Sequence, residues 1–419
     1  MRTLASVCPA TLAEDPSVQP RQVICPGNVM HSAFQPSAAS HPALRFATPI
    51  PLFAREQALA SIRPAIAERI AGVLESNRYI LGEEVAGFET EFASYIGREH
   101  CVGVGNGTDA LMIGLLALGV GRDDEVIVPA VSFFATAEAV AAIGARPVFA
   151  DVEPGTWTIS ARTIGPALSE QTAAIVPVHL FGNPAPMSEL LELAASHDIP
   201  VLEDAAQAAG AQLDERMAGA LGHAAAFSFY PGKNLGAIGD AGAIATDDAE
   251  VAARARRLRD HGSADKRIHT EVGFNSRLDA IQAAALRVAL PHLDAWTVAR
   301  RSAAAAYRGA GLGDLVELPV EADGAESCFH LFVVASPHRD RLHEALKARG
   351  IETRVYYTPV LPEQPALSNF RPETPLPGAQ LYGENSLALP MGESLNVSSV
   401  ERVVEAICDT LSSLEKVDG

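Results

Sequence analysis

One lysine differs in its surroundings from the other lysines of the chain. The 419-residue chain has four lysines, and Lys266, Lys347 and Lys416 each lie close to other charged residues, as is typical of a solvated surface. Lys233 follows an apolar run and a Pro-Gly turn and precedes a glycine-rich stretch, in FSFYPGKNLGAIGDAG. Partial desolvation lowers the pKa of a lysine and favours its nucleophilic amine. We therefore predict that Lys233 is a reactive amine, against the alternative of an ordinary surface lysine on a loop.

A carboxylate lies 29 residues before this lysine, at the end of another apolar run. Asp204 ends the strand-like segment IPVLED (199–204). A buried carboxylate is costly unless it is paired, and the protonated ring nitrogen of pyridoxal phosphate would pair it, because that cofactor needs an acidic partner there. The alternative is that Asp204 caps a helix beginning at the following alanines. Glu203 would point to the opposite face of the strand and is the weaker candidate.

A glycine-rich turn precedes both residues in the chain. In GVGNGTDAL (103–111) a strand runs directly into a helix, so backbone N–H groups and the Thr108 hydroxyl could bind a phosphate. The same segment also fits a loose dinucleotide-binding pattern, GxGxxA from Gly105 to Ala110. That pattern expects an acidic residue at the end of the next strand, whereas Asp123, Asp124 and Glu125 precede it.

Two further segments could contribute to a site. Phe133 follows the apolar run EVIVPA (125–130) and could stack on a heteroaromatic ring, although a core phenylalanine is the commoner case. Asn275-Ser276-Arg277 offers donors for a phosphate or carboxylate, or else an N-cap for the helix that follows. The twelve histidines are dispersed and Ser228 is not in a GxSxG motif, so we predict neither a metal site nor a hydrolase nucleophile.

Composition narrows the class of protein. With 48% hydrophobic residues the chain can bury a large core, and a net charge of −19 disfavours binding to nucleic acid or an anionic membrane surface. Five scattered cysteines without CxxC spacing suggest reduced thiols and a cytoplasmic location. We see neither a secretory signal nor a membrane-spanning run.

The elements that must position these residues alternate between short apolar runs and helical segments. Runs at 101–105, 125–130, 147–152, 173–181, 199–205, 224–230 and 241–246 are separated in several places by helical segments, such as 109–118, 135–143 and 187–196. This pattern predicts an α/β fold, with a mostly parallel central sheet covered on both faces. Functional groups then belong at the carboxyl ends of the strands.

Three regions follow from the rest of the pattern. Residues 1–45 are rich in proline and are predicted to be a poorly ordered extension. Residues 46–290 form the large domain, which begins with a helix from about 55 to 76 that Pro64 could kink. Residues 291–419 form a smaller α+β domain, with helices at 292–310, 339–349 and 400–414 and strands at 330–335 and near 353–357.

Taken together, these segments resemble a fold-type I pyridoxal-phosphate enzyme of the DegT/DnrJ/EryC1/StrS family of sugar aminotransferases. The resemblance spans residues 48–410 and rests on RYILGEEVAGFETEF (78–92), GVGNGTDAL, DDEVIVPAVSFFAT (123–136), PVHLFGNP (177–184), EDAAQA (203–208), FSFYPGKNLGAIGDAGA (227–243) and NSRLDAIQAA (275–284). Its wording is most similar to the branch that aminates C-3 of dTDP-linked keto-deoxysugars. It implies an aminotransferase that moves nitrogen from L-glutamate to a keto sugar.

The resemblance also implies roles for individual residues. Lys233 would bind pyridoxal phosphate covalently and Asp204 would pair with its ring nitrogen. The remaining contacts with the cofactor would come from Gln207 at the ring hydroxyl, Phe133 stacked on the ring, and Gly107, Thr108 and Ser228 at the phosphate. Asn275 would reach the phosphate of a second subunit's cofactor, which implies a homodimer with shared active sites.

The chain departs from the family pattern where the sugar nucleotide would bind. The segment VYYTPVLPEQPAL (355–367) lacks the expected histidines, and the tyrosine expected near Lys266 is absent. Arg277 and Arg354 are candidate cations for a diphosphate in their place. The alternatives are an aminotransferase of a cyclitol ketone or of another nucleotide keto sugar (C-4), a nucleotide-binding oxidoreductase that uses the 103–111 glycines, and a catalytically silent binding protein of the same fold, for example a regulatory partner.

Overall fold

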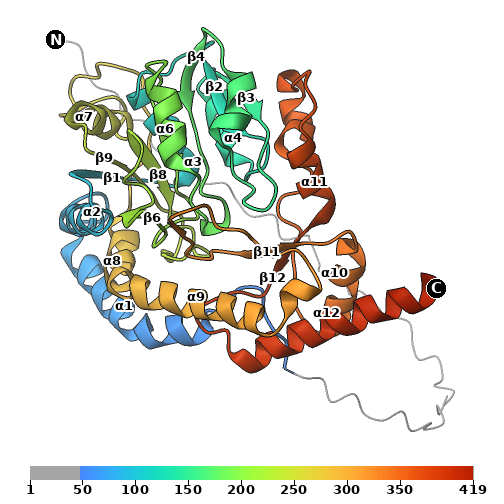
Figure 1. Ribbon diagram of the computed structural model, residues 1–419. Helices are drawn as coiled ribbons and strands as arrows, with labels where there is room; N and C mark the ends of the chain where they lie inside the picture. Colours follow the sequence, from blue (N-terminus) through green and yellow to red (C-terminus); the bar gives the residue numbers. More distant parts are fainter. Residues whose placement is uncertain (1–47, 419) are drawn as a thin grey trace, which may run out of the picture. The chain divides into compact units, whose positions relative to one another are not determined.

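A twisted sheet organises the part of the chain that carries the candidate residues (Figure 1). The computed structural model describes residues 48–418, and the predicted extension at 1–45 lies outside them. One set of strands is ordered β3-β2-β4 and a second β1-β9-β8-β5, and parallel bridges at Ile175–Val201 and Val178–Asp204 join β4 to β5. In these two sets only β9 runs antiparallel to its neighbours. The predicted α/β fold with a mostly parallel sheet is confirmed.

The strands are short and each coincides with an apolar run of the sequence. Those of the central sheet are β1 (His100–Val104), β2 (Glu125–Pro129), β3 (Arg146–Ala150), β4 (Thr172–Ile175), β5 (Leu202–Asp204), β8 (Ala224–Ser228) and β9 (Gly242–Thr246). Smaller strands are β6 (Gln212–Leu213), β7 (Arg216–Met217), β10 (Ala325–Glu326), β11 (Phe332–Ala335) and β12 (Ser386–Leu389). The hairpin β6-β7 and its partner β10 carry too few residues to show a strand period, and the sequence analysis missed them.

Most of the helices follow the helical segments predicted from the sequence, whereas the helices that begin at residues 83, 161, 249 and 377 were not predicted. Those N-terminal to residue 290 are α1 (Glu56–Ser76), α2 (Glu83–Ile96), α3 (Gly107–Ala117), α4 (Ala135–Ala142), α5 (Ala161–Ile164), α6 (Met187–Ala195), α7 (Ala249–Leu258) and α8 (Ala280–Ala289). The later ones are α9 (Leu293–Gly309), α10 (Arg339–Ala348), α11 (Pro377–Asn385) and α12 (Val397–Asp418). Helix α1 continues through Pro64 as one element. None of the helices within 48–418 is both long and apolar enough to cross a bilayer.

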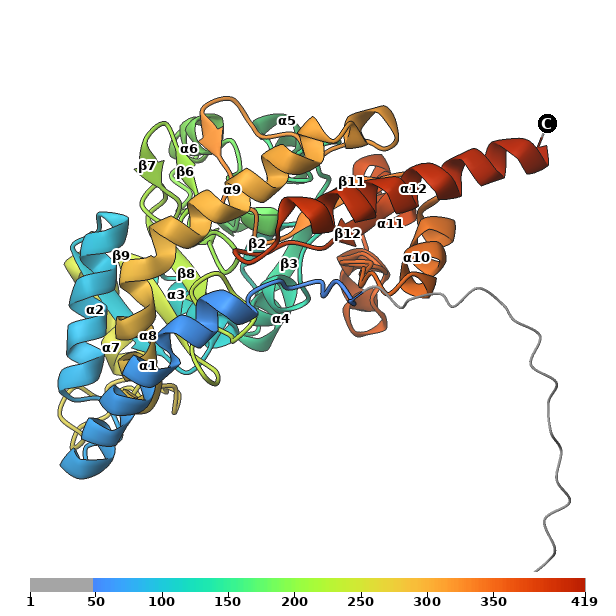
Figure 2. The same cartoon turned by 90° about the horizontal axis from the view of Figure 1, so that it is seen from below.

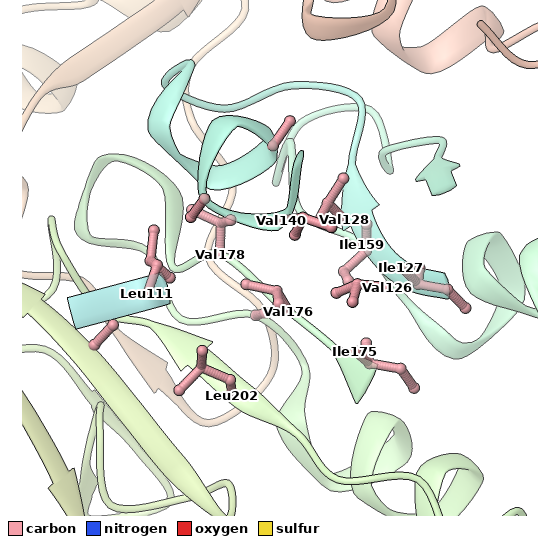
Figure 3. Packing of buried hydrophobic residues seen from close by; sticks show 14 of the residues in the cluster. Leu111, Val126, Ile127, Val128, Val140, Ile159, Ile175, Val176, Val178 and Leu202 are labelled. Atoms are coloured by element: carbon pink, nitrogen blue, oxygen red, sulfur yellow. The ribbon is translucent and has the colours of Figure 1, made fainter. Parts of the chain in front are cut away.

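The sheet is covered on both faces at β8 and β9, because alternate residues of these strands enter different clusters. In β8, Ala224 and Ala226 pack in the cluster that contains helix α3, whereas Ala225 and Phe227 pack in the cluster that contains α2 and α8. The first cluster extends across β2, β4 and β5, where Val126, Val128, Ile175 and Leu202 meet Leu111 of α3 and Val140 of α4 (Figure 3). This double coverage explains why the strands read as apolar runs without alternation.

The C-terminal part of the chain has a core of its own. Residues of α9, α10 and α12 pack with one face of the pair β11-β12, and Figure 2 shows α9 and α12 lying over these two strands. The predicted strand near 353–357 is wrong: the segment makes only the single bridge Arg354–Ala388. The partner of β11 is β12, which follows α11 and was not predicted. A 3-10 turn at Leu290–His292 joins α8 to α9, and the division of 46–419 at residue 290 stays a prediction.

Candidate active site

Lys233 lies in a tight turn directly after β8. Its N–H donates to the Tyr230 carbonyl at 2.8 Å, and the Ala237 N–H donates to the Phe229 carbonyl at 2.8 Å. The residue is half-buried, and within residues 48–418 its amine has neither a hydrogen bond nor an ion pair. Burial lowers the pKa of the amine to about 8, although the charge of Asp204 acts in the opposite direction. A half-neutral amine at mild pH can act as a nucleophile or as a base.

Asp204 ends β5, the parallel neighbour of β8, so both residues lie at the same end of the sheet. Its Oδ2 accepts from the Thr136 hydroxyl at 2.8 Å and its Oδ1 from the Ala206 N–H at 3.2 Å. Burial outweighs these bonds and raises the pKa of the carboxyl. Turns rather than a helix follow Asp204, so the alternative that it caps a helix is wrong.

Glu203 points away from this site, as the strand alternation predicts. Its carboxylate accepts from the N–H groups of Gly219, Leu221 and Gly222 at 2.7, 2.8 and 2.6 Å. It also lies 2.8 Å from Nε2 of His179, whose Nδ1 accepts from the Ala185 N–H at 3.0 Å. Nε2 therefore carries the ring proton and donates to Glu203. The sequence analysis did not find this buried pair, since His179 alone shows no motif.

The turn between β1 and α3 has the form expected of a phosphate cradle. Asn106 caps α3 and accepts from the Asp109 N–H at 2.8 Å, which leaves the N–H groups of Gly107 and Thr108 at the open end of the helix. A Cβ at Gly107 would lie 2.6 Å from the Cβ of Ser228, so only glycine allows this approach. Gly107, Thr108 and Ser228, predicted separately along the chain, are thus brought together.

Phe133 does not belong to the core. Its side chain is 53% exposed at the end of β2, and its ring centroid lies 5.7 Å from that of Tyr357. The alternative of a core phenylalanine is therefore wrong. An exposed ring that follows a strand is available for stacking on a planar group.

Gln207 and Tyr357 form a contact that the sequence analysis did not foresee. Gln207 Oε1 accepts from the Phe181 N–H at 2.7 Å, and its Nε2 donates to the Tyr357 hydroxyl at 3.2 Å. The Tyr357 ring stacks on Phe181 with centroids 6.1 Å apart. Tyr357 lies in the segment that departs from the family pattern, so no motif marked it.

Asn275 is exposed on a loop before α8. Its Oδ1 accepts from the Arg277 guanidinium, which also pairs with Asp260 at 2.8 Å. Ser276 donates to Asp109 at 2.6 Å and accepts from the Gly105 N–H at 3.0 Å, so this loop is attached to the phosphate cradle. The residue at the N-cap of α8 is Asp279, so the alternative that Asn275 or Ser276 caps this helix is wrong.

These residues fit pyridoxal phosphate. Asp204 is a buried carboxylate without a cation within 4 Å in residues 48–418, and a protonated ring nitrogen is the missing charge. Lys233 supplies a desolvated amine at the neighbouring strand end, and the Gly107 turn supplies N–H donors for a phosphate. No such match exists for a dinucleotide, since β2 ends at Pro129 without the acidic residue.

Comparison with known sequences gives a coherent set of relatives. A model described as the DegT/DnrJ/EryC1/StrS aminotransferase family matches residues 60–408. The dTDP-3-amino-3,4,6-trideoxy-alpha-D-glucose transaminase of Streptomyces venezuelae is 44% identical over 361 residues, which cover 85% of this chain and 95% of that protein. The pleiotropic regulatory protein of Geobacillus stearothermophilus is 43% identical over 364 residues, covering 86% and 98%. The UDP-N-acetyl-3-dehydro-alpha-D-glucosamine 3-aminotransferase of Acidithiobacillus ferrooxidans is 41% identical over 364 residues, covering 87% and 98%.

Solved structures give the same result. The crystal structure of S. venezuelae DesV is 43% identical, has a TM-score of 0.83, and matches 86% of this chain and 98% of its own. A Bacillus subtilis protein, NtdA, solved with the bound cofactor PMP, is 29% identical with a TM-score of 0.81, covering 88% and 86%. The expected fold-type I architecture is confirmed by these likenesses.

Proposed function

This chain belongs to the DegT/DnrJ/EryC1/StrS aminotransferase family, and we propose that it transfers the amino group of L-glutamate to C-3 of a dTDP-linked 3-keto-6-deoxyhexose. It is a pyridoxal-phosphate-dependent sugar aminotransferase. The observation that carries the proposal is the pair of groups at adjacent strand ends, the Asp204 carboxylate without a cation and the desolvated Lys233 amine. Pyridoxal phosphate, when bound, supplies an electron sink for the bonding electrons at the amino carbon.

The residues of the site divide the work of holding this cofactor. Lys233 binds it covalently, Asp204 pairs with its ring nitrogen, and Gln207 bonds its ring hydroxyl. Phe133 lies against the ring, and the phosphate is held by Gly107, Thr108 and Ser228. The support for these assignments is the convergence of the residues on one end of the sheet and the match between each group's chemistry and its partner.

Lys233 also moves the proton. In the half-reaction with the donor its Nζ would take the proton from the Cα of glutamate, and in the half-reaction with the sugar it would deliver a proton to the carbon that receives nitrogen. A pKa of about 8 suits both directions, since the amine is neither fully protonated nor fully neutral at mild pH. Asp204, buried and held by Thr136, places its carboxylate where the ring nitrogen would pair with it.

The substrate assignment follows from the relatives. The Streptomyces and Acidithiobacillus proteins are named for 3-amino and 3-dehydro nucleotide sugars. The exposed Arg354 is a candidate cation for the diphosphate in a chain that lacks histidines at 355–367. A cyclitol ketone or a C-4 ketone of another nucleotide sugar is the alternative substrate, and a silent regulatory protein is the alternative class, in line with the name of the Geobacillus relative.

A homodimer is part of the proposal. Exposed apolar residues lie on segments that contact helix α8: the Tyr79 carbonyl accepts from the Ala280 N–H, and the Ile238 N–H donates to Gln282. Tyr79 and Ile238 are 42% and 53% exposed, and Tyr230, whose carbonyl holds the Lys233 turn, is 58% exposed. Such a patch suits a partner subunit, whose site Asn275 would enter. Dispersed thiols, with Cys101 and Cys328 buried and unpaired, suit a cytoplasmic enzyme.

The absorbance spectrum of the cofactor tests the function. The purified protein is expected to be yellow, and L-glutamate is expected to bleach this band. A panel of dTDP-, UDP- and GDP-linked keto sugars and scyllo-inosose is then added to the bleached protein, and the band returns only with a substrate. Recovery of the band with a dTDP-linked 3-keto-6-deoxyhexose supports the proposal. Recovery with scyllo-inosose alone would show that the substrate is a cyclitol ketone instead. A protein that cannot be reconstituted with cofactor is a silent homologue.

A further inference from the structure

A buried group of three charged side chains lies behind the turn that carries Lys233. Glu393, in the loop between β12 and α12, receives Arg55 Nε on Oε1 at 2.8 Å and Arg300 Nη2 on Oε2 at 2.7 Å. The three side chains are at most 5% exposed. Arg55 precedes α1 and Arg300 lies in α9, so the group joins segments that are far apart in the chain. We call these three residues the Arg–Glu–Arg group.

Arg55 is bonded to the backbone of the Lys233 turn. Its guanidinium donates to the carbonyl oxygens of Pro231 and Asn234, each at 3.0 Å, and to the carbonyl of Lys233 itself. The planar guanidinium presents its donors in a fixed geometry, so these bonds define the orientation of the turn as well as its position. Arg55 is therefore a direct link between Glu393 and the backbone atoms from which the Lys233 side chain extends.

Arg300 fixes a second support of the same turn. It donates to the carbonyls of Phe329 and His330 at 3.0 and 3.3 Å. The segment it holds contacts Asn234, because His330 Nδ1 lies 3.2 Å from Asn234 Oδ1 and Asn234 Nδ2 donates to the Cys328 carbonyl at 3.1 Å. Glu393 thus orients Arg55, which bonds the Lys233 turn directly, and Arg300, which holds the segment at 328–330 that contacts Asn234.

The loop that carries Glu393 is itself fixed against Arg55. The Met391 N–H donates to the Leu52 carbonyl at 2.8 Å, and the Ser394 N–H donates to the Ala54 carbonyl at 2.8 Å. A Cβ at Gly392 would lie 2.3 Å from the Ala54 carbonyl oxygen, so the backbones approach as closely as glycine permits. The carboxylate of Glu393 therefore has little freedom to move relative to Arg55.

We propose that Glu393 and Arg55 are positioning residues for the Lys233 amine, a step that rests on the proposed function of Lys233 as the reactive amine. Burying two guanidiniums and a carboxylate brings little net stability, because desolvation offsets most of the attraction. What these bonds supply is a fixed backbone under an amine that must reach the Cα of one substrate and a carbon of the other. A misplacement of about 1 Å can cost about 100-fold in rate.

The test compares Arg55→Gln, Arg55→Lys and Glu393→Gln with the control Arg301→Gln. Arg301 is the next residue of α9 and is bonded to Glu326 and to the Ser327 carbonyl, so its loss removes a comparable set of bonds away from the turn. The melting temperature of each variant reports folding. Amide hydrogen exchange of residues 231–237 in the cofactor-free protein reports the rigidity of the turn, independently of any activity.

We expect Arg55→Gln to accelerate exchange at residues 231–237 about tenfold or more and to slow the half-reaction with glutamate about 100-fold. The dissociation constant of glutamate should change less than about threefold, since the side-chain bonds of Arg55 go to the turn and to Glu393. Arg55→Lys should lie between the wild type and Arg55→Gln. The double variant Arg55→Gln/Glu393→Gln should lose less than the sum of the two single losses, because part of the effect of Glu393 passes through Arg55 and the rest through Arg300. Arg301→Gln should leave both readouts unchanged.

Equal exchange and equal half-reaction rates in Arg55→Gln and Arg301→Gln would overturn the proposal, as would additive losses in the double variant. If Arg55→Gln does not fold, Arg55→Lys and Glu393→Gln are compared with Arg301→Gln in the same two measurements. Failure of the proposed function looks different. If Lys233 is not the reactive amine, Lys233→Ala keeps the half-reaction with glutamate. Amide exchange of residues 231–237 is then still faster in Arg55→Gln than in the wild type.

Discussion

Glu203 and Asp204 are consecutive residues whose carboxylates occupy opposite faces of β5 and opposite electrostatic environments. Burial alone would raise the pKa of Glu203, but the bonds from His179 and the Gly219 and Gly222 amides outweigh it and lower this pKa. Asp204 has one hydroxyl and one amide donor, and burial raises its pKa. The Glu203 carboxylate is fully hydrogen-bonded within the fold, whereas the Asp204 carboxylate is available to pair with a cationic group. This contrast makes the two residues matched test positions.

The substitution Asp204→Asn is expected to stabilise the cofactor-free protein and to cripple the reaction. An amide of the same shape removes a charge that burial disfavours, while it also removes the partner of the ring nitrogen. We expect the half-reaction with glutamate to slow by about 100-fold or more, or about 2.7 kcal/mol at 1.36 kcal/mol per tenfold. Stopped-flow absorbance and the melting temperature of the cofactor-free protein measure the two effects. A near-normal rate would contradict the pairing.

The substitution Glu203→Gln is expected to act on stability instead. Replacing this carboxylate by an amide leaves buried donors among His179 and the Gly219–Gly222 amides unsatisfied, at about 1–3 kcal/mol for each. The half-reaction rate per folded molecule should stay within about threefold of the wild type, a change of about 0.65 kcal/mol in barrier. The pKa of Glu203 is lower in the folded than in the unfolded state, so its contribution is present above about pH 4.3 and is lost as the pH falls through the folded pKa. Below pH 4 the wild type should therefore lose its advantage over Glu203→Gln in denaturant unfolding. A constant difference from pH 3 to pH 7 would contradict this assignment.

The amine of Lys233 should titrate near pH 8 in the cofactor-free protein. Acylation by acetic anhydride, followed by peptide mass spectrometry, gives its reactivity against pH, and a lysine model peptide with a pKa of about 10.4 is the reference. Because the charge of Asp204 raises this pKa, Asp204→Asn should lower the midpoint further. Between pH 8 and about 10.4 the unfolded chain holds the extra proton, so this group's contribution to the free energy of unfolding rises with pH. A midpoint equal to that of the peptide would show that the amine is not desolvated.

The shared site predicts complementation between inactive variants. Lys233→Ala and Asn275→Ala homodimers should each be impaired, since one lacks the amine and the other the donor that reaches across the interface. When the two are unfolded, mixed in equal amounts and refolded, half of the dimers are mixed, and each of these has one intact site. The mixture should regain about a quarter of the wild-type activity. Lys347→Ala, which changes an exposed lysine of α10, serves as the control for amine loss. No recovery from a mixture shown by light scattering to be dimeric would remove Asn275 from the partner's site.

The Phe133 ring should matter for the cofactor and little for the fold. It is more than half exposed, so Phe133→Ala should cost less stability than the 3–5 kcal/mol of a core phenylalanine. Loss of stacking should weaken the binding of pyridoxal phosphate about tenfold, or about 1.4 kcal/mol. Phe133→Tyr, which keeps the ring, should bind nearly normally. The dissociation constant is measured by titrating cofactor-free protein, and unchanged binding in Phe133→Ala would refute the stacking.

The central sheet was predictable because its signal is local. Runs such as 224–230 and 241–246 are apolar on both faces of the strand, and each became a strand with ends within two residues of the prediction. Asp204 and Lys233 were found in the same way, as polar residues directly after such runs. The predicted strand near 353–357 failed because only Arg354 pairs with a strand residue, while the Tyr357 ring lies against those of Phe133 and Phe181. The true partner of β11 is the four-residue run at 386–389.

The sequence alone therefore determined which chemical groups are present and which strand ends carry them. Apolar runs and turn residues can be recognised from residues that are adjacent in the chain. The tertiary structure decided which distant groups meet. Tyr357 accepts a hydrogen bond from Gln207, 150 residues away in the chain, and His179 donates one to the buried Glu203. Glu393 joins Arg55 to Arg300 behind the Lys233 turn. A single tyrosine, histidine or glutamate shows no periodicity and no motif. Its role exists only once packing has removed water and brought its partners together.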